Sequence, residues 1–189
     1  MYACLCNFII YHLIRMGLRP SRDFRSRPAG RYKSRSGQSH KEADSTLRPN
    51  DGIEWPSLVI EAGWSESDAR LRADGRWWLA NPHTQLVLLI SYQRSLRILQ
   101  IQKYEREEID TVVTRTSPDG RRLVPVCTGT VNIDLSSSSP TIISGAPFIL
   151  PFEALMRRRP AEGTEERDVE LSHQNCIAWA ESFAEALGQ

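Results

Sequence analysis

Two short apolar runs on either side of a helical pattern constrain the fold most. Residues 57–62 read SLVIEA and residues 86–90 read LVLLI, and continuous apolar runs of this length are typical of strands covered on both faces. Between them Ser65 can cap a helix, which ends at Asn81 because the next residue is a proline. This order predicts an α/β fold in a single domain, with a mixed central sheet flanked by helices.

The remaining segments extend this pattern at both ends. The first 17 residues, MYACLCNFIIYHLIRMG, predict an amphipathic helix, and residues 18–40 are rich in Arg, Ser, Gly and Pro, which predicts a loop or a partly disordered arm. We therefore expect a basic N-terminal helix and arm over residues 1–40 and the folded domain over residues 41–189. Within that domain the pattern predicts strands over 96–104, 109–115 and 124–135, a short helix over 152–158 and an amphipathic C-terminal helix over 169–187.

The distribution of charge and the cysteine content suggest which partners the protein binds and where in the cell it is located. Residues 1–50 hold ten Lys and Arg against three Asp and Glu, so the N-terminal segment is basic and the rest of the chain is acidic. The arm over 18–40 is either a solvated tether or a segment that lies along nucleic-acid phosphates. No apolar run reaches the roughly 18 residues of a spanning helix, so we expect no membrane partner. Four scattered cysteines without a signal peptide favour an intracellular location, and the choice between nucleus and cytoplasm stays open.

Glu61 is the strongest candidate for a catalytic or metal-binding residue. It lies inside an apolar strand, where a carboxylate is costly to bury unless it is paired or bound to metal. Asp44 opens the preceding segment, and if residues 44–48 and 57–62 form adjacent strands, both carboxylates can point to one edge of the sheet. Two hard oxygen ligands suit Mg²⁺ or Mn²⁺. The simpler alternatives are that Asp44 is a turn residue and that Glu61 forms an ion pair with Arg72 or Arg76.

Three stretches carry a resemblance to a known superfamily. They read KEADSTLRP over 41–49, WPSLVIEAGWSES over 55–67 and LRADGRWWL over 71–79. They resemble a group of mostly fungal proteins that are similar to restriction endonucleases of the PD-(D/E)XK superfamily. The resemblance covers residues 40–104 and continues weakly over residues 145–152. It implies a restriction-endonuclease-like core and metal-dependent hydrolysis of phosphodiester bonds in a nucleic acid, with Mg²⁺ or Mn²⁺ as the cofactor.

The resemblance also assigns the metal ligands. Asp44 matches the Asp of the superfamily motif, with Ala43 where a proline is usual, and Glu61 matches its second acidic residue. Both would be catalytic metal ligands, with the backbone carbonyl of Ala62 as a third ligand. Many related nucleases dimerise, so a homodimer is implied as well.

The sequence departs from the motif at Gly63, where the superfamily has a lysine. Arg72 and Arg76 on the following helix are the expected substitutes, since arginine stabilises phosphate charge although it cannot act as a base at neutral pH. Lys41 is a further cation near Asp44. The chain is therefore expected to be either a metal-dependent nuclease or a catalytically inactive nuclease-like fold that binds nucleic acid or protein. A structural protein with an ion-paired Glu61 is the remaining alternative.

The tryptophans also allow two interpretations. They can stack on nucleic-acid bases, or they can pack the helix that follows the first apolar strand onto the sheet. Packing is the simpler interpretation for the four of them in this region, which are Trp55, Trp64, Trp77 and Trp78.

Overall fold

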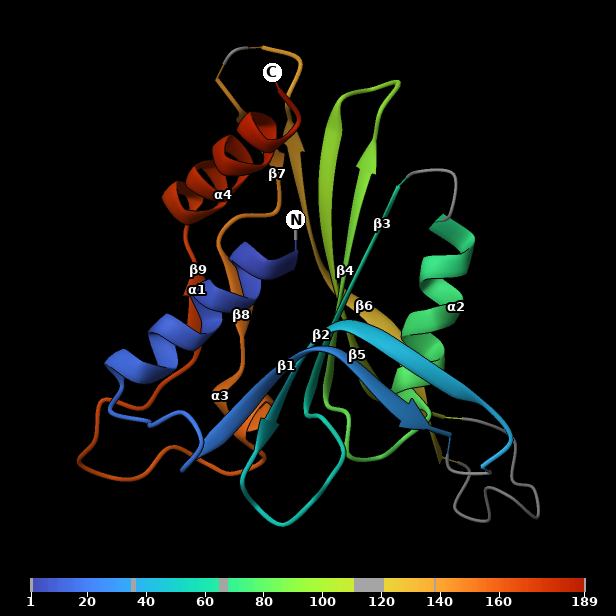
Figure 1. Ribbon diagram of the computed structural model, residues 1–189, viewed down its shortest axis with the longest axis vertical. Coiled ribbons are helices and arrows are strands. Elements are labelled where there is room, and N and C mark those ends of the chain that lie inside the picture. The colour runs from blue at the N-terminus through green and yellow to red at the C-terminus, as the bar shows by residue number, and fades with distance from the viewer. Residues whose placement is uncertain (1, 35–36, 65–67, 111–120, 138, 189) are drawn as a thin grey trace.

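The centre of the structure is a mixed sheet whose middle strands, β3 (Leu58–Trp64) and β4 (Leu86–Gln93), pair in parallel (Figure 1). The computed structural model describes residues 2–34, 37–64, 68–110, 121–137 and 139–188. Within them the sheet has seven strands in the order β1-β2-β3-β4-β5-β6-β7, and every neighbouring pair except β3–β4 is antiparallel. The other strands are β1 (Phe24–Lys33), β2 (His40–Pro49), β5 (Ile98–Asp110), β6 (Arg121–Asp134) and β7 (Thr141–Ser144).

Helices cover both faces of this sheet (Figure 1). The α2 helix (Asp68–Leu79) packs on one face, where it meets the side chains of Val59, Val87 and Leu89. The α1 helix (Tyr2–Arg15) and the α4 helix (His173–Ala186) pack on the opposite face. The expected α/β architecture, a mixed sheet flanked by helices in one compact body, is confirmed.

A small second sheet closes the side that carries α1 and α4. It consists of β8 (Phe148–Leu150) and β9 (Val169–Leu171), which pair antiparallel, and the α3 helix (Phe152–Met156) follows β8 directly. Phe148, Leu150, Val169 and Leu171 are all buried in the same core as α1. This layer therefore shares its core with the main sheet.

The elements with strong apolar patterns are where the sequence predicts them. The strands over 57–62 and 86–90, the helix that ends before Asn81, the short helix after residue 151 and the N-terminal helix are all present. The proposed helix cap at Ser65 lies outside the described residues. So does most of the strand expected over 109–115, whose first two residues end β5.

One predicted element is wrong, and another begins later than predicted. Residues 18–40 are not an irregular arm throughout, because Phe24–Lys33 forms the edge strand β1 and pairs along most of β2. The C-terminal helix begins at His173 rather than at residue 169, because residues 169–171 pair with β8 and the side chain of Ser172 caps the helix by accepting from the backbone N–H of Asn175. The three strands β7, β8 and β9 are not predicted by the sequence at all.

The α1 helix is integral to the main core. Leu5, Ile9 and Leu13 are buried with Leu58 and Ile60 of β3. The boundary expected after residue 40 therefore does not separate two cores. No helix in the described ranges combines the length and the apolar character needed to cross a membrane.

Leu13→Ala tests this packing, and its neighbour provides a matched control. Leu13 is fully buried, whereas Ile14 on the same helix is 46% exposed. Truncating the buried side chain leaves a cavity and should lower the free energy of unfolding by about 2–5 kcal/mol, whereas Ile14→Ala should change it by less than about 1 kcal/mol. Urea unfolding followed by circular dichroism measures both. Equal losses in the two variants would show that α1 is not part of the core.

Candidate functional site

The Asp44 carboxylate lies where β2 and β3 separate. The ladder between these strands runs from Leu47↔Leu58 to Ser45↔Ile60 and ends there. One residue further, the backbone N–H of Ala62 donates to Oδ2 of Asp44 at 2.7 Å. The carboxylate thus takes over the link between the strands, so Asp44 is positioned by a strand and not by a turn.

An irregularity on the other side of β2 accompanies this arrangement. The β1–β2 register passes from Pro28↔Ser45 to Gly30↔Ala43, and Ala29, opposite Asp44, has a φ of +52°. Left-handed backbone angles at a non-glycine residue mark a local distortion of the strand. The register is the same on both sides of Ala29, so the distortion is confined to this one position of the ladder.

Glu61 of β3 points toward α2 and is held there by an indole. Its side chain is buried, and Nε1 of the fully buried Trp78 donates to Oε1 at 2.5 Å. Oε1 of Glu61 therefore accepts a hydrogen bond from an uncharged group on α2, the indole of Trp78. It is this hydrogen bond, and not the ion pair with Arg72 or Arg76 that the sequence allows, that positions the oxygen.

The environment raises the pKa of Glu61 to about 7. Burial, which removes water from the carboxylate, is the main cause, and the negative charge of Asp44 adds to it. The hydrogen bond from Trp78 and the positive charge of Lys41 act in the opposite direction. Glu61 is therefore about half protonated near neutral pH, so a nearby positive charge would shift it strongly toward the ionised form.

A pocket of about 290 Å³ opens beside these two carboxylates. Its lining residues come from β2, β3 and α2, and they are Glu42, Asp44, Glu61, Ala62, Gly63, Arg70, Leu71 and Asp74. The structure thus brings together Asp44, Glu61 and Ala62. We refer to this hollow as the carboxylate pocket.

The cations at this pocket differ from those the sequence predicts. Arg70 of α2 lines it, and Lys41 of β2 forms an ion pair with Asp74. Arg72 and Arg76 are exposed and are not among the lining residues.

Helix geometry explains this difference. Residues three and four apart share a helix face, so Leu71, Asp74 and Trp78 turn together toward the sheet. Arg72 and Arg76 lie four apart on another face and remain exposed. The spacing of α2 therefore keeps the expected substitutes for the motif lysine outside the pocket.

The donor set of the pocket fits a magnesium-like ion. Mg²⁺ keeps several of its waters and is commonly held by one or two carboxylates, as Asp44 and Glu61 provide. No group of three His, Cys, Asp or Glu side chains in the described part of the chain is arranged to hold a metal. Any ion here would depend on these two carboxylates and on water, and the carbonyl of Ala62 stays a predicted third ligand.

Four aromatic rings form a wall beside the carboxylate pocket. Trp77 and Trp78 meet edge to face with ring centroids 4.7 Å apart, and Tyr32 lies 5.5 Å from Trp78 and 5.3 Å from Trp55. Trp78 packs α2 on the sheet, as the simpler interpretation predicts, while the side chain of Trp64 lies outside the described residues.

Comparison with protein-family models, with curated proteins and with solved structures finds no match for this chain. The resemblance to PD-(D/E)XK proteins therefore depends on the three sequence stretches alone, and the site is interpreted from its own geometry.

The sequence did not reveal the partners of the two acidic residues. Trp78, Arg70 and Glu42 were not among the predicted site residues, and the ion pair between Lys41 and Asp74 was not anticipated. One signal was available: Asp74 and Trp78 follow Leu71 at helical spacing, which places them on the buried face of α2.

Glu61→Gln should change how stability depends on pH. Because the pKa of Glu61 is raised in the folded state, its protonated form stabilises the fold below about pH 4.5, and this contribution is lost as the pH rises toward 7. The glutamine variant cannot lose a proton. Its free energy of unfolding relative to wild type should therefore increase by about 2–3 kcal/mol from pH 5 to pH 8.

Urea unfolding across this pH range in EDTA measures the effect. Glu42→Gln removes an exposed carboxylate from the same pocket and should follow wild type. Parallel curves for wild type and Glu61→Gln would contradict the raised pKa.

Proposed function

We propose that the protein is a metal-dependent nuclease that hydrolyses phosphodiester bonds at the carboxylate pocket. One observation carries the proposal: Asp44 and Glu61, from adjacent strands, line a single small pocket in which Glu61 is largely removed from water. A divalent cation would offset the repulsion between these two carboxylates. Mg²⁺ and Mn²⁺ are the cations that their oxygen ligands favour.

The arrangement of the strands supports the restriction-endonuclease-like core that the resemblance implies. That core has one acidic residue on one strand of a mixed sheet and the acidic motif on the next. Asp44 lies on β2 and Glu61 lies on the neighbouring β3, with α2 following directly. This correspondence supports the proposal through topology and does not depend on overall similarity.

Both candidate ligands are held in place before any ion or substrate binds. The N–H of Ala62 fixes Oδ2 of Asp44, and the indole of Trp78 fixes Oε1 of Glu61. Hydrogen bonds of this kind orient metal ligands. A bound ion would polarise the phosphodiester and lower the pKa of its bound water.

Positive charge for the transition state would come from β2 and from the first turn of α2. Arg70 lines the pocket, and the charge of Lys41 already acts on Glu61. Both are better placed than Arg72 and Arg76 to replace the lysine absent at Gly63. Lys41 would have to exchange Asp74 for the substrate phosphate.

The alternative is a catalytically inactive nuclease-like fold that binds nucleic acid or protein. The observation that favours it is the lack of a lysine on β3 together with the exposed positions of Arg72 and Arg76. The two functions differ in one measurable property, because only the nuclease requires Asp44 and Glu61 for turnover.

Cleavage assays on labelled plasmid, single-stranded DNA and RNA with Mg²⁺ or Mn²⁺ test the proposal. Asp44→Asn and Glu61→Gln each remove a negative ligand and should lower kcat at least about 100-fold. Glu42→Gln should stay within about threefold of wild type, because Glu42 is exposed and holds no ion in this proposal.

The same assay ranks the cations. Lys41→Met should lower kcat more than Arg76→Met if Lys41 replaces the motif lysine. Failure of the folded wild-type protein to cut any substrate with metal present would favour the inactive binding fold.

Metal affinity should depend on pH in a defined direction. Below pH 7 a proton competes with the ion for Glu61, so Mn²⁺ binding should weaken by up to about tenfold for each pH unit below 7 and level off above it. Intrinsic tryptophan fluorescence can follow the titration because Trp78 contacts Glu61. Loss of the pH dependence in Glu61→Gln would assign it to this residue, whereas identical profiles for the two proteins would exclude Glu61 as a ligand.

A further inference from the structure

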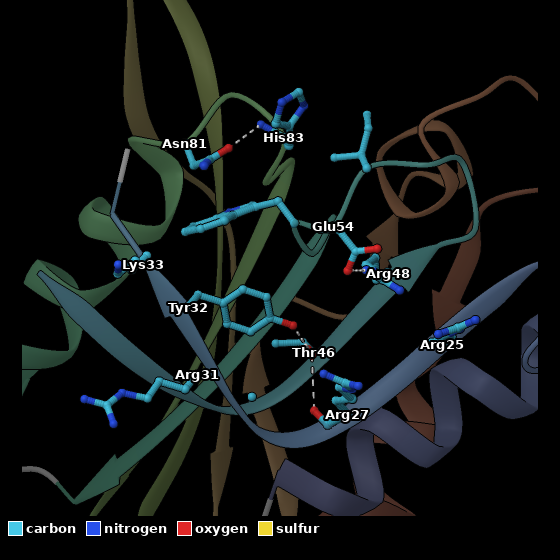
Figure 2. A pocket seen from close by; sticks show the side chains of 13 residues that line it. Arg25, Arg27, Arg31, Tyr32, Lys33, Thr46, Arg48, Glu54, Asn81 and His83 are labelled. Carbon is cyan, nitrogen blue, oxygen red and sulfur yellow. Dashed lines mark hydrogen bonds and ion pairs between the residues drawn. The ribbon is translucent and has the colours of Figure 1, made fainter. Parts of the chain in front are cut away.

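A second and larger hollow lies against β1 and the start of the β2–β3 connection. Its volume is about 600 Å³, and it shares no lining residue with the carboxylate pocket. In Figure 2, Arg25, Arg27 and Arg31 follow β1 along one side, Asn81 and His83 lie across from them, and Tyr32 lies between. We call this hollow the β1 cleft.

The β1 cleft is strongly basic. Five lining side chains are cationic and one is acidic, and that one, Glu54, is paired with Arg48. The other four cations are exposed and have no ion-pair partner among the described residues; they are Arg25, Arg27, Arg31 and Lys33. Such a concentration of like charge destabilises the fold slightly unless an anion binds to it.

The opposite wall of the β1 cleft is firmly built. Arg157 donates to both carboxylate oxygens of Asp51, at 2.7 and 2.9 Å, and also to the backbone carbonyls of Trp55 and His83. The indole of Trp55 donates to the hydroxyl of Thr84 at 2.6 Å. These bonds tie the segments around Asp51–Trp55 and His83–Thr84 to each other, so the wall is in place before a ligand arrives.

Aromatic rings accompany the cations. Tyr32 and Trp55 line the cleft, are each partly exposed, and meet edge to face. Stacking of bases on such rings, next to cations that contact the phosphates, is how proteins bind single strands without sequence preference.

We propose that the β1 cleft binds a single-stranded segment of nucleic acid. The partly exposed rings of Tyr32 and Trp55 favour a single strand over a duplex, because the bases of a single strand are free to stack on aromatic side chains. The volume of the β1 cleft, about 600 Å³, is in the range of sites that enclose a small ligand. A hollow of this size has room for on the order of one or two nucleotides. This inference deepens the proposed function and rests on it for the role of the bound strand as a substrate.

The aromatic wall connects the two hollows. Tyr32 faces the cleft and contacts Trp78, whose indole donates to Glu61 in the carboxylate pocket. Tyr32 also pairs with Lys41 across the β1–β2 ladder. A strand held in the cleft therefore lies next to the wall behind which Asp44 and Glu61 meet.

Fluorescence polarisation in EDTA tests the inference without turnover. The probes are labelled ten-nucleotide oligo-dT and oligo-U, and a hairpin duplex with the same number of phosphates. Wild type should bind the single strands at least tenfold more tightly than the duplex. The double variant Arg25→Ala/Arg27→Ala should lose about tenfold or more in affinity and show a shallower dependence on salt, by about 0.7 per lost phosphate contact.

A matched control removes two exposed arginines elsewhere. Arg159→Ala/Arg167→Ala loses the same charge outside the cleft, since both side chains are exposed and only weakly paired, and its affinity should stay within about twofold of wild type. Thermal unfolding confirms that each variant is folded. Equal losses in the two double variants would show a general charge effect, and equal or tighter binding of the duplex would also overturn the inference.

The two proposals can fail separately. Asp44→Asn should still bind the single strands while losing cleavage. Single-strand binding that depends on Arg25 and Arg27, in a protein that does not cut, would support the cleft and reject the nuclease. Cleavage without such binding would support the nuclease and reject the cleft.

Discussion

The parallel pairing of β3 and β4 is the constraint on which the rest of the structure depends. Both strands are buried on their two faces, from Leu58 to Glu61 and from Leu86 to Tyr92. Parallel neighbours need a crossover, which α2 supplies on one face, and the apolar side chains on the other face need separate cover. The α1 and α4 helices provide that cover, so segments from both ends of the chain meet at the middle of the sheet (Figure 1).

The same constraint gives the carboxylate pocket its chemistry. Glu61 follows three fully buried residues of β3 and lies under α2, so its carboxylate has lost most of its water. The fold offsets part of this cost with the hydrogen bond from Trp78 and with the positive charge of Lys41. Asp44 reaches the same place because the pairing of β2 with both neighbouring strands is interrupted there. Each carboxylate thus accepts one hydrogen bond from a neighbouring element, Asp44 from the backbone N–H of Ala62 and Glu61 from the indole of Trp78.

The fold could be predicted from the sequence where a local pattern is strong. Continuous apolar runs and helical periodicity identified the two central strands, the crossover helix and the N-terminal helix. The edge strand β1 could not be identified in this way, because only Phe24 and Gly30 of its ten residues are buried and its sequence contains Arg, Pro and Gly. Its strand conformation comes from pairing with β2. Residues 169–171 were misassigned because Val169 lies at helical spacing from Cys176 and Ala180, whereas the burial of both Val169 and Leu171 is the alternation of a strand.

The sequence by itself determined that Glu61 lies on a buried strand of an α/β sheet, since burial of an apolar run is a local signal. The pairing of β2 with β3, which brings Asp44 to the same place, was a conditional expectation that only the structure could decide. Only the tertiary structure decided which side chains surround the two carboxylates. Arg70 lines the carboxylate pocket and Lys41 pairs with Asp74 at its edge. Arg72 and Arg76 do not line it, because side-chain direction depends on helix phase. The β1 cleft likewise exists only because β1 folds back along β2. Charges that are scattered along the sequence become one basic hollow when strand register and loop contacts bring them together.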